Sequence, residues 1–149
     1  MEALSLFGYW KIINNRTKKQ NNMKDVIYNS TLHFEHELWK SELAFWKDEL
    51  KSFKNRLGEL VIRWTDKDVL AQLEPYQNEF ILHGGVIEDL KETIEKHEIN
   101  IAGHSQKGNV SMDVAMVKTH LEYREKMETQ RQIYADLKKE FFRFLSKYM

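Results

Sequence analysis

The sequence predicts an all-α protein: an antiparallel up-down-up bundle of three long helices with a short N-terminal arm. From Ser30 onward, apolar residues recur every three or four positions, which is the period of an α-helix. The chain has one proline and six glycines, too few for a fold with many strands and tight turns. Its 149 residues suit one domain with one core. We therefore divide the chain into an arm, residues 1–29, and a helical bundle domain, residues 30–149.

The composition excludes several classes of function. Lysine and arginine, 23 together, balance 23 acidic residues, so we expect no general attraction to nucleic acid. The absence of cysteine removes disulfides and thiolate metal sites, and we expect a cytoplasmic protein. No apolar run approaches the ~20 residues of a membrane-spanning helix. The arm contains the polar, aperiodic stretch NNRTKKQNN, so we expect it to be flexible or loosely docked.

The first predicted helix starts near Ser30 or Thr31, either of which can cap it. Its apolar stripe alternates steps of four and three residues, which is the a/d seam of a heptad repeat. The stripe contains Leu32, His36, Trp39, Leu43, Trp46, Leu50, Phe53, Leu57, Leu60 and Trp64. A very short turn follows, so the next helix must lie antiparallel to this one.

The second predicted helix starts at Thr65, with Asp68 placed for a capping box, and ends at Gly103. Pro75 cannot donate a backbone hydrogen bond and clashes with the preceding turn. Either the helix kinks at Pro75, or residues 65–74 form a separate turn and Pro75 begins the helix proper. The stripe contains Leu73, Tyr76, Phe80, His83, Ile87, Leu90, Ile94, His97 and Ile101.

The third predicted helix starts at Ser111, after a loop over residues 103–110, and returns along the hairpin. Arg124 lies on its stripe, where we expect it to pair with a glutamate of a neighbouring helix or to reach solvent. Its C-terminal segment, KKEFFRFLSKYM, is expected to close the bundle near Trp64. Because a single a/d stripe is narrow, we expect a homodimer or a protein partner to cover an exposed seam.

The histidines are the candidate site residues. A first turn centred near residue 66 places His36 opposite His97, which makes them candidate metal ligands, and places His120 about two turns deeper, near Leu90. His33, His104 and His120 are further candidates. Together with nearby Glu35 or Asp113, such imidazoles could hold zinc or iron. The paired Glu-x-x-His of di-iron bundles and the His-Glu-x-x-His of zinc proteases are both absent.

Two segments, LHFEHELWKSELAFWKDELKSFKNRL and REKMETQRQIYADLKKEFFRFLSKYM, resemble small bacterial helical-bundle proteins of unknown function. They cover about a third of the chain. The resemblance implies a bacterial, coiled-coil-like helical bundle, and it supplies neither an activity nor a functional residue.

The first functional hypothesis is a non-enzymatic interaction or scaffold protein without a cofactor. The alternative is a metal-binding or metal-sensing bundle that uses the core histidines. A third hypothesis, ranked below both, is contact with a membrane surface through the aromatic N-terminus or the basic C-terminal helix. No nucleophile with an adjacent base, and no phosphate-binding glycine loop, indicates an enzyme.

Overall fold

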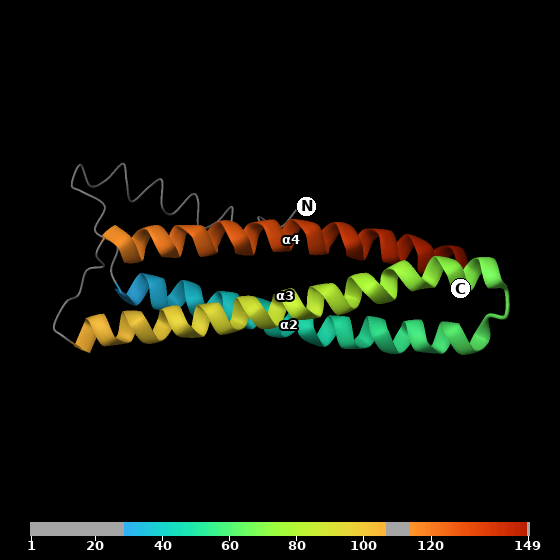
Figure 1. Ribbon diagram of the computed structural model, residues 1–149, viewed down its shortest axis with the longest axis horizontal. Coiled ribbons are helices and arrows are strands. Elements are labelled where there is room, and N and C mark those ends of the chain that lie inside the picture. Colours follow the sequence, from blue (N-terminus) through green and yellow to red (C-terminus); the bar gives the residue numbers. More distant parts are fainter. Residues whose placement is uncertain (1–28, 107–113, 149) are drawn as a thin grey trace.

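The computed structural model describes residues 29–106 and 114–148, which form three long helices. Helix α2 spans Asn29–Arg63, α3 spans Lys67–Gln106 and α4 spans Val114–Tyr148. Figure 1 shows α3 running back along α2, and α4 returning in the direction of α2. The two described ranges contain no strand, so the predicted all-α, up-down-up bundle is confirmed. The predicted arm and the cap at Ser111 lie outside the described residues, apart from Asn29, which begins α2.

The limits of α3 differ from the prediction at both ends. Asp66, rather than Thr65, caps the helix, because its Oδ1 accepts a hydrogen bond from the Asp68 backbone N–H at 2.8 Å. The helix passes through Pro75, so the alternative of a separate turn before this residue is wrong. It also continues beyond Gly103 to Gln106. A glycine inside a helix costs only about 1 kcal/mol, and the helix therefore need not stop there.

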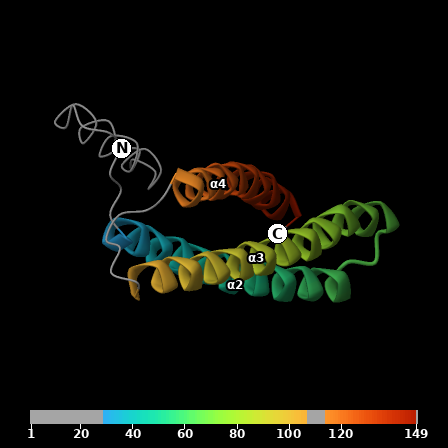
Figure 2. The same cartoon turned by 60° about the vertical axis from the view of Figure 1, so that its left-hand side comes forward.

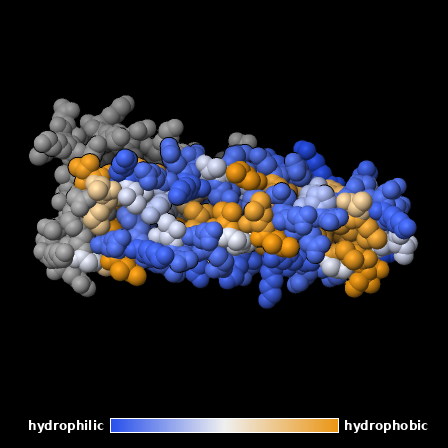
Figure 3. Space-filling model, viewed as in Figure 1, coloured by the Kyte–Doolittle hydropathy of each residue, from blue (hydrophilic) through white to orange (hydrophobic). Residues whose placement is uncertain are grey.

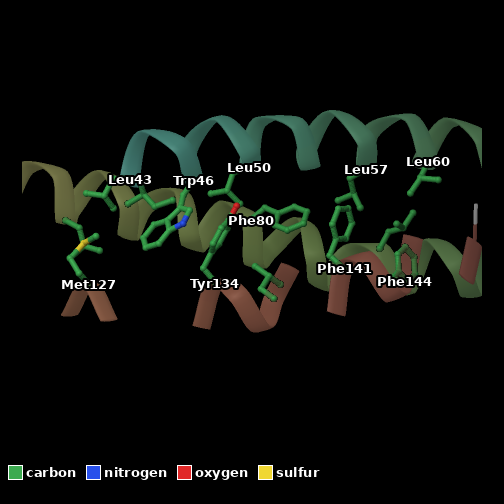
Figure 4. Close-up of a cluster of buried hydrophobic side chains, with 14 of the residues drawn as sticks. Leu43, Trp46, Leu50, Leu57, Leu60, Phe80, Met127, Tyr134, Phe141 and Phe144 are labelled. Atoms are coloured by element: carbon green, nitrogen blue, oxygen red, sulfur yellow. The ribbon is translucent and has the colours of Figure 1, made fainter. Parts of the chain in front are cut away.

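The predicted seams form the core of the bundle. In Figure 4, Leu43, Trp46, Leu50, Leu57 and Leu60 of α2 point toward side chains of the other two helices. The centre of this core is aromatic, with the fully buried rings of Phe80 and Phe141 edge to face at a centroid distance of 4.9 Å. At the end of the bundle with the α2–α3 turn, Trp64 contacts Tyr148 at a centroid distance of 5.9 Å. The C-terminal segment therefore closes the bundle near Trp64, as predicted.

A ladder of ion pairs joins the two helices that run in the same direction, α2 and α4. The pairs recur every seven residues, at Glu35–Arg124, Glu42–Arg131 and Glu49–Lys138, with N···O distances of 2.9, 2.5 and 3.0 Å. Heptad spacing produces this ladder because it keeps the same face of each helix toward its partner. The prediction that Arg124 pairs with a glutamate of a neighbouring helix is confirmed.

The two halves of α4 are held to the hairpin in different ways. The buried residues of its second half are Tyr134, Leu137, Phe141 and Phe144. Those of its first half are His120, Met127 and Gln130. Figure 2 shows α4 as a separate rod lying along the α2–α3 hairpin. The first half of α4 is therefore attached mainly through polar groups, and this half carries the site described below.

The part of the chain that the structure describes contains no candidate membrane-spanning helix. None of its helices combines the length and the apolar character needed to cross a bilayer.

Candidate metal centre

Three histidines, one from each helix, meet in the interior of the bundle. His36 of α2, His97 of α3 and His120 of α4 are exposed to only 0%, 4% and 0%. Their ring centroids lie 5.0 Å apart for His36–His97, 5.0 Å for His36–His120 and 5.6 Å for His97–His120. One ligand nitrogen from each ring lies within 4.8 Å of the other two. We call His36, His97 and His120 the histidine cluster.

The structure confirms that His36 faces His97, but the predicted position of His120 is wrong. This residue lies in the same layer as His36 and His97, not two turns deeper. The connection between α3 and α4 is centred near residue 110, midway between Gln106 and Val114, rather than near residue 105. The later centre moves each residue of α4 toward the end of the bundle where α2 begins.

The other candidate ligands do not join the cluster. The side chain of His33 is 58% exposed and contacts Glu98 instead. The side chain of His104 and the whole of Asp113 lie outside the described part of the chain. Glu35 lies beside the cluster and contacts it through His120.

Two carboxylates orient two of the three rings of the cluster. His36 donates from Nδ1 to Glu98, which also accepts a hydrogen bond from His33, and His120 donates from Nε2 to Glu35. An ionised carboxylate can only accept, so these bonds place the ring protons on His36 Nδ1 and His120 Nε2. The lone pairs are then on His36 Nε2 and His120 Nδ1. Arg124 fixes Glu35 in turn, with its Nη2 2.9 Å from the same carboxylate oxygen.

One nitrogen of each ring is buried and has no hydrogen-bond partner. Six buried side-chain nitrogen or oxygen atoms of the described residues lack a partner, and three of them are His36 Nε2, His97 Nε2 and His120 Nδ1. A buried polar atom without a partner costs about 1–3 kcal/mol. Three such atoms on neighbouring rings therefore destabilise the folded protein, unless they share a ligand.

Burial sets the protonation state of the cluster. Burial lowers the pKa of His36 and of His120 from its ordinary value, although Glu98 and Glu35 oppose the shift. Burial, together with the charges of His36 and His120, lowers the pKa of His97 to about 4. All three imidazoles are therefore neutral at pH 7, and this is the form that binds metal ions.

The two carboxylates next to the cluster are ionised. Burial raises the pKa of Glu35, but hydrogen bonds and charges of His120 and Arg124 outweigh burial and lower it overall. Glu98 follows the same pattern, because the hydrogen bonds of His36 and His33 outweigh its burial and lower its pKa. The cluster thus has two negative charges close to its neutral rings.

Aromatic rings cover two sides of the cluster. Trp39 stacks on His120 at a centroid distance of 4.9 Å and an interplanar angle of 22°. Tyr123 packs edge-on against His97 at 5.2 Å. An apolar cover of this kind excludes water and strengthens electrostatic interactions inside the site. A role in the site for Trp39, Tyr123 or Glu98 was not predicted from the sequence.

The fold and the cluster together define the class of protein: an all-α three-helix bundle with a buried three-histidine site. No protein-family model matches the chain, and neither does any curated protein or solved structure. What the site binds is therefore inferred from its own geometry.

Proposed function

We propose that the protein binds one divalent transition-metal ion through the histidine cluster. The observation that carries the proposal is the set of three buried, unpartnered ring nitrogens, one from each helix. A cation is a single ligand that all three nitrogens can share, whereas a hydrogen-bond donor would satisfy fewer of them. The neutral state of the rings supports this function, because no proton has to be displaced at pH 7.

The donor set favours a transition metal such as zinc or iron over calcium and magnesium. Imidazole nitrogen suits zinc, copper, iron and nickel, whereas calcium and magnesium prefer oxygen ligands. Iron sites of the two-histidine, one-carboxylate type need a carboxylate ligand. Here both oxygens of Glu98 accept hydrogen bonds, from His33 and His36. Glu35 accepts from His120 and Arg124 at Oε1 only, and its buried Oε2 has no partner. Carboxylates in this outer position raise the basicity of metal-bound histidines and hold their rings in place.

Binding requires the rings to move slightly. A tetrahedral zinc ion with Zn–N bonds of about 2.0–2.1 Å sets its nitrogens about 3.3 Å apart. The ligand nitrogens of the cluster lie within 4.8 Å of one another, so side-chain rotations draw them together around the ion. The helices themselves already hold the three side chains in one layer.

Metal content of protein purified without a histidine tag tests the proposal. We expect one equivalent of zinc or iron, and its complete loss in His97→Asn. The matched control is His83→Asn, because His83 is also buried in α3, at 3% exposure, but contacts Gln130 instead of the cluster. Circular dichroism checks that both variants remain helical. The proposal fails if the native protein binds no metal even when zinc is supplied, or if both variants lose it equally.

Partner binding without catalysis is the second candidate function. A groove of about 530 Å³ lies near the α2–α3 turn, and its lining includes Leu57, Val61, Leu70, Leu73 and Ile81. Val61 and Ile81 in this groove are exposed to 50% and 60%. Figure 3 shows apolar surface at this end of the bundle. An apolar groove between two helices suits the apolar face of a partner helix or of a second copy of the chain.

Sedimentation measured over a range of concentrations tests self-association through this groove. If two copies associate there, we expect Ile81→Glu to raise the dissociation constant of the dimer more than tenfold, because the charge would have to be buried in the interface. Ile99→Glu is a matched control, since Ile99 lies on the same helix, is 70% exposed and does not line the groove. A monomer at every concentration contradicts the homodimer.

A further inference from the structure

We propose that a divalent cation reaches the histidine cluster through a groove between α3 and α4, and that the ring of Tyr123 controls its passage. A buried metal site needs a path by which the ion enters. This inference rests on the proposed metal-binding function, and it names the route and the residue that set how fast the ion exchanges.

A polar groove lies between α3 and the first half of α4. Its volume is about 490 Å³, and water occupies about 30 Å³ per molecule in the liquid, so an ion with its hydration shell fits inside. Most of its lining is polar or charged and comes from α4, with Glu122, Glu125, Lys126, Thr129 and Gln130. A hydrated cation can therefore enter the groove without being forced against an apolar wall.

Tyr123 lies between this groove and the cluster. Its ring meets the ring of His97 edge-on, at a centroid distance of 5.2 Å. The ammonium group of Lys126, a residue that lines the groove, lies over the same ring at 5.7 Å from its centroid. Tyr123 is half-buried, whereas His97 is only 4% exposed. The ring of Tyr123 therefore separates the groove from the nearest imidazole of the cluster.

Tyr123 is held less firmly than the other tyrosines of the described helices. The hydroxyls of Tyr76, Tyr134 and Tyr148 donate hydrogen bonds at 3.3, 3.0 and 3.0 Å. The hydroxyl of Tyr123 forms no hydrogen bond with any residue that the structure describes. Partly exposed side chains rotate orders of magnitude faster than packed helices separate. Rotation of this ring can therefore open the route while α3 and α4 stay in place.

The other two sides of the cluster are closed by groups that are fixed more firmly. Where α2 meets α4, the indole of Trp39 stacks on His120 at a centroid distance of 4.9 Å. Where α2 meets α3, Glu98 accepts hydrogen bonds from both His33 and His36. Entry from either side requires a stacked indole or a doubly bonded carboxylate to move. The side between α3 and α4 therefore offers the least resistance to an ion.

Rates of zinc uptake and release by the full-length protein test the inference. Stopped-flow mixing with a zinc indicator measures uptake, and transfer to excess EDTA measures release. We expect Tyr123→Ala to raise both rates about tenfold or more, because passage no longer depends on the fraction of time in which the ring is rotated away. The three imidazoles are unchanged, so the dissociation constant of zinc should change by less than about threefold. Tyr123→Phe keeps the ring and should exchange zinc at the native rate.

Tyr148→Ala is the matched control, because it removes a half-buried tyrosine from the other end of α4, where Tyr148 contacts Trp64. Equal acceleration in Tyr148→Ala and Tyr123→Ala overturns the inference, since the ion would then escape through general loosening of α4. Unchanged rates in Tyr123→Ala also overturn it, while the metal-binding function stays intact. If the native protein binds no zinc, the proposed function fails and the inference fails with it.

A second substitution blocks the route and leaves Tyr123 in place. Thr129 is exposed and lines the groove between α3 and α4. Thr129→Trp should slow both uptake and release about fivefold, because the indole fills the path of the ion. Gln77→Trp is its matched control, because Gln77 is also exposed but lines the groove near the α2–α3 turn. Both positions tolerate a large side chain, so this pair decides the question even if Tyr123→Ala does not fold. Equal rates in the two tryptophan variants overturn the inference.

Discussion

Zinc at about a thousand times its dissociation constant is expected to raise the free energy of unfolding by about 4 kcal/mol. The folded chain presents three buried imidazoles in one layer, and the unfolded chain does not, so zinc binds the folded state preferentially. Because His120 is a ligand, zinc should also hold the first half of α4 against the α2–α3 hairpin. The buried residues of this half are His120, Met127 and Gln130. Urea denaturation of the full-length protein, with zinc and with a chelator, measures the difference.

The same denaturation experiment on two variants locates the effect. His120→Asn is expected to abolish the stabilisation by zinc, because the site loses its ligand from α4. His83→Asn is expected to retain it, since His83 is buried outside the histidine cluster. Equal stabilisation of all three proteins would mean that zinc acts somewhere else on the chain.

The metal-free protein is expected to lose about 3 kcal/mol of stability between pH 6.5 and pH 4 through His97 alone. The pKa of His97 is about 4 in the folded protein, against about 6.5 in an unfolded chain. Between these values the unfolded chain binds a proton that the folded protein does not, so acid favours unfolding. A difference of one pKa unit corresponds to about 1.4 kcal/mol.

Other groups change stability in the same direction. Burial lowers the pKa of His36, His83 and His120, so their contributions are also complete above pH 6.5 and decline as the pH falls. The lowered pKa values of Glu35 and Glu98 add a further loss at still lower pH, when these carboxylates become protonated. Chemical denaturation in the presence of a chelator measures the profile. Unchanged stability from pH 7 to pH 5 would contradict the prediction, and His97→Asn should flatten the profile.

The hairpin of α2 and α3 could be predicted because its turn is so short. Only residues 64–66 separate the two helices, so the pairing of residues along them follows from the position of the turn. This is why the contact between His36 and His97 could be read from the sequence. Errors of one to three residues at the ends of α3, at Asp66 and Gln106, did not alter this pairing.

The position of His120 could not be predicted as closely, because the connection before α4 is longer. Residues 107–113 separate the helices, and a small change in the assumed centre of this connection moves α4 along its neighbours. Glu98 was missed for another reason. It lies beside the seam rather than on it, and its role depends on reaching across to His36 and His33. The available signal was an acidic residue directly adjacent to a seam histidine, at Glu35–His36 and at His97–Glu98.

The heptad ladder between α2 and α4 has a consequence for how the two helices find their register. If α4 slid by seven residues, Arg131 would reach Glu35 and Lys138 would reach Glu42, so oppositely charged partners would still face each other. The three ion pairs alone are therefore compatible with more than one register of α2 and α4.

The imidazole layer removes this degeneracy. After a slide of seven residues, Met127 would take the place of His120, and a thioether would face His36 and His97. A polar residue at a single seam position is known to select one alignment of packed helices at some cost in stability. The three histidines thus favour one register of α2, α3 and α4. A metal ion bound by all three would stabilise the one register in which they lie in the same layer.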